Sequence, residues 1–204
     1  VHLYEEEGET MLSRLRGMFS FTIYNKADGS LFIARDFFGI KPLYYARMGD
    51  SFLFGSEIKS FLDHPEFRKE LNLDALESYL SFQYSSLPET FFKDVYKLTP
   101  GHFLRFREGT VEVVRYFQAD FANDESLELN PLVDRIEEAF KDSVAAHKIS
   151  DVEVGSFLSS GIDSSYAATV FQGDKTFTVG FDKDKYNETS YAKELSKTIG
   201  IRNE

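Results

Sequence analysis

Short apolar segments separated by turn residues dominate the first 116 residues. Met18 to Tyr24 is apolar and aromatic, and Leu31 to Ala34 forms a second apolar segment after the turn residues Asp28-Gly29. The same pattern predicts further strands at 43–46, 52–55, 102–106 and 110–116. Short helices are expected after Ser56 and over 74–82. This part of the chain therefore predicts sheets packed against helices.

The pattern changes at residue 118. Residues 118–130 are polar and acidic, which is typical of a linker. After Pro131, apolar residues recur every fourth position and predict an amphipathic helix; they are Leu132, Ile136, Phe140 and Val144. Strand and helix patterns then alternate: a strand to Leu158, a helix to Phe171, a strand over 176–181 and a helix over 188–199. Such alternation predicts a parallel sheet with helices on its faces.

The segment between that first strand and its helix carries the most chemistry. It reads Ser159-Ser160-Gly161-Ile162-Asp163-Ser164-Ser165. A loop that turns from a strand directly into a helix exposes backbone N–H groups, and the helix dipole favours anions there. Gly161 permits close approach of a ligand, and the Asp163 carboxylate suits Mg²⁺ bound to a polyphosphate. Ser and Asp are also ordinary helix N-cap residues, so local chemistry alone leaves simple capping open.

Composition narrows the classes of function. The chain has 204 residues and a net charge of −11, so it is a poor candidate for binding nucleic acid or an anionic membrane surface. It contains no cysteine, which removes disulfides, thiolate metal sites and a cysteine nucleophile from these residues. No apolar segment is long enough to cross a bilayer, and a cytoplasmic location is expected. Because the first residue is Val1, we expect a piece of a longer protein.

Two separated motifs resemble one known family. The first is Arg-Asp-Phe-Phe-Gly-Ile-Lys-Pro-Leu-Tyr-Tyr at 35–45, followed by Gly-Ser-Glu-Ile-Lys at 55–59. The second runs from Ser150 through Gly155 and continues into the loop at 157–165. In this order, with a linker between them, the motifs closely resemble glutamine-hydrolysing asparagine synthetase. The first resembles the later half of its class II glutaminase domain, and the second resembles the start of its ATP-pyrophosphatase synthetase domain.

The resemblance implies a fold and an activity. The expected fold class is α/β and α+β: residues 1–117 form the later half of an N-terminal-nucleophile-type αββα glutaminase sandwich, 118–130 a linker, and 131–204 the start of a parallel-sheet ATP-pyrophosphatase domain. The family releases ammonia from glutamine with a cysteine, and converts aspartate with ATP and Mg²⁺ into β-aspartyl-AMP, which ammonia attacks. The resemblance also suggests a homodimer.

The family's binding residues are carried over position by position. The pyrophosphate loop corresponds to Ser159, Ser160, Gly161, Ile162, Asp163, Ser164 and Ser165, with Asp163 at the position of a Mg²⁺ ligand. Phe157 and Leu158 correspond to residues that line the nucleotide pocket, and Val179 to a position that contacts adenine. Periodicity by itself favours plain core strands for these last three residues.

Other polar residues of the two motifs receive no catalytic role. For Arg35 and Asp36 the resemblance suggests a framework role near the interface between glutaminase and synthetase. Glu57 and Lys59 are interpreted as interface or structural residues, with a role in the ammonia path as the alternative. A helix start explains Glu188, and a position near a helix end explains His147.

Two departures from the family limit what these residues can do. Ser160 stands where the family usually has glycine, and no cysteine nucleophile is present. We therefore expect the intact protein to make asparagine and residues 1–204 alone to be inactive. One alternative is a β-lactam synthetase-like cyclase or another specialised amidotransferase, which differs in the acceptor pocket. The other is a non-catalytic nucleotide-binding regulatory module, which the missing cysteine and Ser160 would suit.

Overall fold

The structure is a computed structural model that describes residues 1–85, 88–122, 124, 126–181 and 187–204. Two residues of the expected linker, Asn123 and Glu125, lie outside the described residues. The chain divides into two compact units, Val1–Phe121 and Ala122–Glu204. Each unit is described by itself below.

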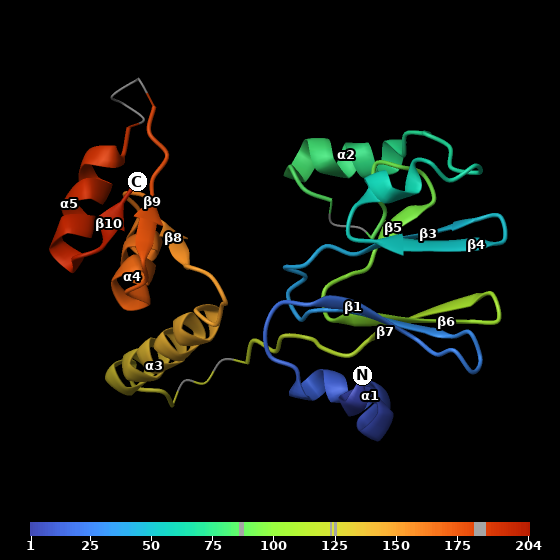
Figure 1. The fold of residues 1–204 in the computed structure, drawn as a ribbon, viewed down its shortest axis with the longest axis horizontal. Coiled ribbons are helices and arrows are strands. Elements are labelled where there is room, and N and C mark those ends of the chain that lie inside the picture. The colour runs from blue at the N-terminus through green and yellow to red at the C-terminus, as the bar shows by residue number, and fades with distance from the viewer. Residues whose placement is uncertain (86–87, 123, 125, 182–186) are drawn as a thin grey trace. The chain divides into compact units, whose positions relative to one another are not determined.

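The first unit is built of four layers, helix on sheet on sheet on helix (Figure 1). One antiparallel sheet has the order β1-β2-β6-β7, and the other has the order β4-β3-β5. The strands are β1 (Ser20–Tyr24), β2 (Leu31–Arg35), β3 (Tyr44–Met48), β4 (Ser51–Gly55), β5 (Val95–Lys97), β6 (His102–Arg107) and β7 (Thr110–Arg115). The outer layers are α1 (His2–Glu7) with the 3₁₀ helix η1 (Gly8–Arg14) on one side, and η2 (Ile58–Phe61) with α2 (Leu73–Phe82) on the other.

Alternation of side chains along β2 generates two separate cores. Phe32 and Ala34 belong to a buried cluster that includes Leu12 of η1, whereas Ile33 between them belongs to a cluster with Leu104 and partly buried aromatic rings from both sheets. Successive side chains of a strand point to opposite faces of the sheet, so β2 contributes side chains to both cores. Aromatic rings of this Phe-rich region pack between the two sheets. The rings of Phe52 and Phe106 are stacked, with their centroids 4.6 Å apart.

The Arg35-Asp36 pair forms the buried framework of the segment that follows β2. The Arg35 guanidinium donates hydrogen bonds to the backbone carbonyls of Lys41 (2.7 Å), Leu98 (2.5 Å) and Gly39 (2.6 Å). The Asp36 carboxylate accepts from the backbone N–H groups of Phe38 (3.2 Å), Ile40 (3.0 Å) and Lys41 (2.9 Å). Both side chains are almost fully buried. These contacts fix the backbone of 36–41, which supports the framework role expected from the sequence.

Acid is expected to weaken this framework through Asp36. Burial raises the pKa of its carboxyl, but hydrogen bonds from the N–H groups of Lys41, Ile40 and Phe38 lower the pKa more, so the net pKa is lowered. The stabilisation is therefore complete above the unfolded value of about 3.9 and is lost as pH falls through the folded pKa. Urea unfolding should show that the stability gap between the wild type and Asp36→Asn narrows from pH 7 to pH 3. A gap that stays constant would contradict this assignment.

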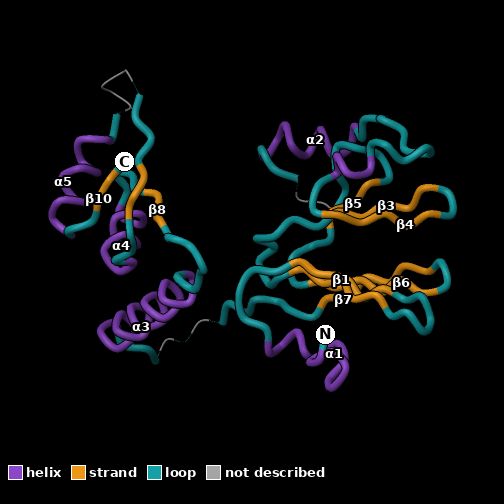
Figure 2. The backbone as a smooth tube through the Cα atoms, in the orientation of Figure 1, coloured by secondary structure: helices purple, strands orange, loops and turns teal. Residues whose placement is uncertain are grey.

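The second unit is a small parallel sheet with helices packed around it (Figure 2). Its elements are α3 (Leu129–His147), β8 (Gly155–Phe157), α4 (Ile162–Phe171), β9 (Lys175–Phe177), α5 (Thr189–Ile199) and β10 (Arg202–Asn203). The strand order is β10-β9-β8, and both pairings are parallel. Its core consists of Leu158, Ala168 of α4 and Ala192 of α5. The loop at 159–165 therefore leaves the carboxyl end of a parallel strand, as the sequence predicted.

Several element boundaries differ from those predicted. The helix after Ser56 is a single 3₁₀ turn, and the helix expected at Pro131 already begins at Leu129. The strand expected over 176–181 ends at Phe177, and α4 begins at Ile162 within the motif itself. No residue of α3 is buried in this unit, although the Phe140 ring of its apolar stripe lies 4.9 Å from the Tyr166 ring of α4.

Candidate functional site

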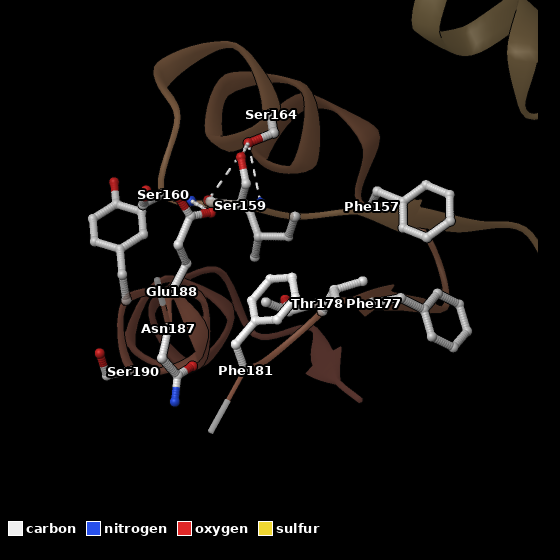
Figure 3. Close-up of a pocket in the computed structure, with 13 residues that line it drawn as sticks. Phe157, Ser159, Ser160, Ser164, Phe177, Thr178, Phe181, Asn187, Glu188 and Ser190 are labelled. Atoms are coloured by element: carbon white, nitrogen blue, oxygen red, sulfur yellow. Dashed lines mark hydrogen bonds between the residues drawn. The ribbon is translucent and has the colours of Figure 1, made fainter. Parts of the chain in front are cut away.

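A pocket of about 710 Å³ opens where β8 and β9 end and α4 and α5 begin (Figure 3). The loop after β8 and the first turn of α4 contribute three serines to its wall, Ser159, Ser160 and Ser164. The opposite wall comes from the segment after β9 and the start of α5, including Thr178, Val179, Phe181, Asn187, Glu188 and Tyr191. A crevice outside the carboxyl ends of parallel strands is where such sheets place their ligands.

Serine hydroxyl groups hold the turn of the loop. Ser164 Oγ accepts from the N–H group of Ser159 at 3.2 Å and lies 2.8 Å from Ser159 Oγ. Ser159 Oγ in turn accepts from the N–H group of Gly161 at 3.2 Å. The hydroxyl of Ser165 donates to the carbonyl of Gly161 at 2.7 Å. Ser159, Ser164 and Ser165 thus act on the loop's own backbone in this structure, and they prearrange it.

The N-terminus of α4 provides the donors that remain for an anion. Gly161 is the N-cap, and the first helical hydrogen bond runs from the N–H group of Ser165 to the carbonyl of Gly161 at 3.1 Å. The N–H groups of Ile162, Asp163 and Ser164 precede that bond, so they have no acceptor within the helix. Together with the helix dipole, they create a positive potential next to the pocket.

Glu188 supplies a carboxylate to the same loop. Its Oε2 accepts from the N–H group of Ser160 at 3.1 Å, across 28 residues of sequence (Figure 3). The hydrogen bonds from the N–H group and the hydroxyl of Ser160 lower the pKa of Glu188, so the side chain is an anion at neutral pH. Glu188 lies at the N-cap of α5, which agrees with the helix start predicted for it, but the sequence pattern does not predict this contact.

The expected nucleotide-pocket residues occupy two different environments. Phe157 and Val179 both line the pocket and are 79% and 66% exposed, so neither side chain belongs to the buried core of this unit. Leu158 also lines the pocket but is buried at 3% exposure in the core of the unit. Phe157 and Val179 therefore offer free apolar surface, whereas Leu158 mainly anchors the loop.

The remaining motif residues lie beside the pocket and do not line it. Gly161, Ile162, Asp163 and Ser165 form the helix entry, and Ile162 is 85% exposed. Asp163 is an exposed carboxylate in the first turn of α4. Within the described ranges no group of three or more metal-binding side chains occurs. One carboxylate suits Mg²⁺ that arrives on a polyphosphate, because Mg²⁺ keeps waters and phosphate oxygens as its other ligands.

Ser160 does not distort the loop. Among the described residues, the non-glycine positions with positive φ are Gln83, Asp94, Glu108 and Gln172, so Ser160 has an ordinary backbone conformation. Ser160→Gly should therefore act only by raising the conformational entropy of the unfolded chain, which lowers the free energy of unfolding by roughly 0.4–1 kcal/mol. The affinity for an anion should stay within about twofold of the wild-type value. Thermal unfolding and a pyrophosphate titration of both proteins measure the two effects. A gain in affinity of tenfold or more would show that serine strains the loop.

Sequence reasoning missed one wall of the pocket. Thr178, Phe181, Asn187, Glu188 and Tyr191 were not among the predicted binding residues, although the strand after a phosphate loop in a parallel sheet ends at the same edge. That topological rule was the available signal.

In the described part of the chain, no helix is long and apolar enough to cross a membrane.

Comparison with known proteins gives concordant matches to both units. The family profile described as "Glutamine amidotransferase domain" matches residues 1–117, and that described as "Asparagine synthase" matches residues 135–204. "Asparagine synthetase [glutamine-hydrolyzing] 1" of Bacillus subtilis is 42% identical over 98% of this chain and 32% of its own length. A "Putative asparagine synthetase [glutamine-hydrolyzing]" of Mycobacterium tuberculosis is 38% identical over the same shares.

The chain thus spans about a third of the length of the curated relatives it matches. Among solved structures, the "Glutamine phosphoribosylpyrophosphate (PRPP) amidotransferase from B. subtilis complexed with ADP and GMP" aligns over 98% of this chain and 34% of its own. The TM-score is 0.37 at 16% sequence identity, so this alignment gives no information about the site.

Proposed function

Because this chain belongs to the glutamine amidotransferase domain family and is a homologue of glutamine-hydrolysing asparagine synthetases, we propose that its intact protein forms asparagine from aspartate. The substrates are aspartate, glutamine and ATP bound to Mg²⁺. The second unit is the start of the ATP-pyrophosphatase domain, and the first unit is the later half of the αββα glutaminase. The homodimer and the cytoplasmic location stay predictions from the resemblance.

The single observation that carries the proposal is the loop at 159–165. It leaves the carboxyl end of parallel strand β8, enters α4 with N–H groups that have no acceptor within the helix, and opens onto a pocket of about 710 Å³. Backbone donors at a helix N-terminus suit phosphate oxygens, and the exposed Asp163 suits the Mg²⁺ that accompanies them. Exposed Phe157 and Val179 give the same pocket apolar surface for a base.

These residues suit the activation of a carboxylate. In the proposed reaction, an oxygen of the aspartate β-carboxylate attacks the α-phosphorus of ATP, and pyrophosphate leaves. Ammonia then attacks the acyl carbon of β-aspartyl-AMP, and AMP leaves with the carboxylate oxygen. Negative charge accumulates on the departing pyrophosphate, so the fixed N–H donors of 162–164 stabilise the transition state more than the ground state.

The cysteine that the family uses for glutamine hydrolysis is not among these 204 residues. The chain contains no cysteine. The first unit instead contributes the two sheets and the Arg35-Asp36 framework, which would support a nucleophile rather than provide one. A protein that consists only of residues 1–204 is therefore expected to release no glutamate from glutamine.

The test compares two proteins in one assay. The longest product of the gene and the chain of residues 1–204 are each incubated with glutamine, aspartate, ATP and Mg²⁺, and asparagine, glutamate, AMP and pyrophosphate are quantified. We expect asparagine, AMP and pyrophosphate in equal amounts from the longest product and none from residues 1–204. AMP and pyrophosphate without asparagine would favour a cyclase or another specialised amidotransferase. Nucleotide binding without turnover would favour a regulatory module.

A further inference from the structure

Glu188 is not an ordinary helix-capping residue, although it occupies the N-cap position of α5. Its side chain makes no capping hydrogen bond to the helix. The preceding residue performs that role, because Asn187 Oδ1 accepts from the N–H group of Thr189 at 3.1 Å and from its hydroxyl at 2.7 Å. The carboxylate of Glu188 is therefore free to point away from α5, and it contacts the loop after β8.

The donor that Glu188 occupies belongs to the phosphate-binding loop. Oε2 of Glu188 accepts from the N–H group of Ser160, and both residues line the same pocket (Figure 3). A carboxylate and a phosphate oxygen are alike as acceptors, since each is an anion that prefers a backbone N–H group. The neighbouring N–H groups of Ser159 and Gly161 are held by the loop's own hydroxyl groups. The Ser160 donor is instead taken by a charged group from another element, the carboxylate of Glu188.

We propose that Glu188 is an internal competitor for the nucleotide: its carboxylate holds the N–H group of Ser160 until the polyphosphate of ATP displaces it. This inference rests on the proposed function and adds a control of nucleotide affinity at the same loop. A polyphosphate placed at Ser160 would lie next to a second anion, and like charges repel. Binding therefore requires the side chain of Glu188 to rotate away, which its exposed position permits.

The contact also has a use in the nucleotide-free protein. The carboxylate satisfies a donor at the loop and pins the start of α5 to the start of α4 in the absence of ligand. Nucleotide binding releases that link, so the α4–α5 entry changes its contacts when the site fills. Glu188 is thus a residue that lowers affinity for ATP and couples the two helix starts.

The test removes the charge in one variant that keeps the shape of the side chain and in another that truncates it. Glu188→Gln and Glu188→Ala are made in the longest product of the gene, with Glu194→Gln as the matched control. Glu194 lies on the same helix, is exposed and does not line the pocket. Affinity for ATP with Mg²⁺ and for pyrophosphate is measured by calorimetry. Amide hydrogen exchange at Ser160 is measured without nucleotide.

Loss of the competing carboxylate should tighten nucleotide binding. We expect both Glu188 variants to bind ATP on the order of three- to tenfold more tightly, the range of one net hydrogen bond, and Glu194→Gln to match the wild type. Weaker or unchanged binding in both Glu188 variants would overturn the proposal, because it would make Glu188 a ligand-holding or neutral residue.

The exchange measurement separates this proposal from the proposed function. In nucleotide-free protein, Ser160 should exchange faster in Glu188→Ala than in the wild type or Glu194→Gln. An unchanged rate would overturn the contact whatever the nucleotide data show. A faster rate together with no ATP binding by any of the proteins would leave the contact intact, overturn competition and contradict the proposed function itself.

Discussion

Replacing Arg35 by methionine is expected to lower the free energy of unfolding by about 3–5 kcal/mol, the cost of removing one partner from a buried charged network. Arg35 is 6% exposed and holds three backbone carbonyls, those of Gly39, Lys41 and Leu98. Methionine fills much of the volume of the Arg35 side chain but donates no hydrogen bond, so these three backbone carbonyls lose their donor. The carboxylate of Asp36 also loses the adjacent positive charge. Urea unfolding of the longest product of the gene measures the change.

The control is Arg107→Met. Arg107 lies at the end of β6, its side chain is 65% exposed, and its ion pairs to Asp28 and Glu108 are 3.8 and 4.0 Å long. Exposed pairs of this kind contribute little, so a change within about 0.5 kcal/mol is expected. Equal losses for the two variants would show that Arg35 has no special framework role.

Replacing Asp163 by asparagine should abolish most of the affinity for ATP in the presence of Mg²⁺. The neutral amide is a poor Mg²⁺ ligand, and even an outer-shell partner of a metal site contributes 10–100-fold, so a loss of roughly a hundredfold or more is expected. Asp163 is exposed and does not line the core, so the fold should remain. Calorimetric titration with ATP measures the loss.

Two comparisons make the Asp163 result specific. Asp134→Asn changes an exposed carboxylate on α3 away from the pocket and should leave the affinity unchanged. When a chelator removes Mg²⁺, the wild type and Asp163→Asn should have the same affinity for ATP. If Asp163→Asn bound ATP with Mg²⁺ as tightly as the wild type, the assignment of Asp163 as the metal ligand would be wrong.

The elements that could be predicted from the sequence are those set by local rules. Apolar and aromatic segments located β1, β2, β6 and β7 to within one or two residues, because each of these strands has turn chemistry at its end. The hairpin between β6 and β7 closes as expected: Glu108 and Gly109 both have positive φ, of 49° and 75°.

Short elements were missed for the opposite reason. Strand β5 has three residues and β10 has two, too few to show a period, and their pairing with β3 and β9 depends on distant segments. Helix α1 is acidic and contains no buried residue, so its sequence lacks an apolar stripe. In each case tertiary contacts, not local propensity, decide the structure.

One wall of the site could be predicted from the sequence, and the opposite wall could not. The loop at 159–165 is continuous in sequence, so its chemistry could be read directly. The wall formed by Phe181, Glu188 and Tyr191 is brought to the loop only by the parallel pairing of β8 with β9. The direction in which Glu188 points is set by Asn187, which takes over the capping of α5. No single-residue signal in the sequence carries that information.

We propose that the loop after Leu158 binds the polyphosphate of ATP. Hydrogen–deuterium exchange of the longest product of the gene, with and without ATP and Mg²⁺, tests it most directly. We expect strong slowing of exchange over 159–166, weaker slowing around 178–181, and no change over the Arg35-Asp36 framework. Unaltered exchange over 159–166 at saturating nucleotide, or protection confined to another part of the chain, would contradict it.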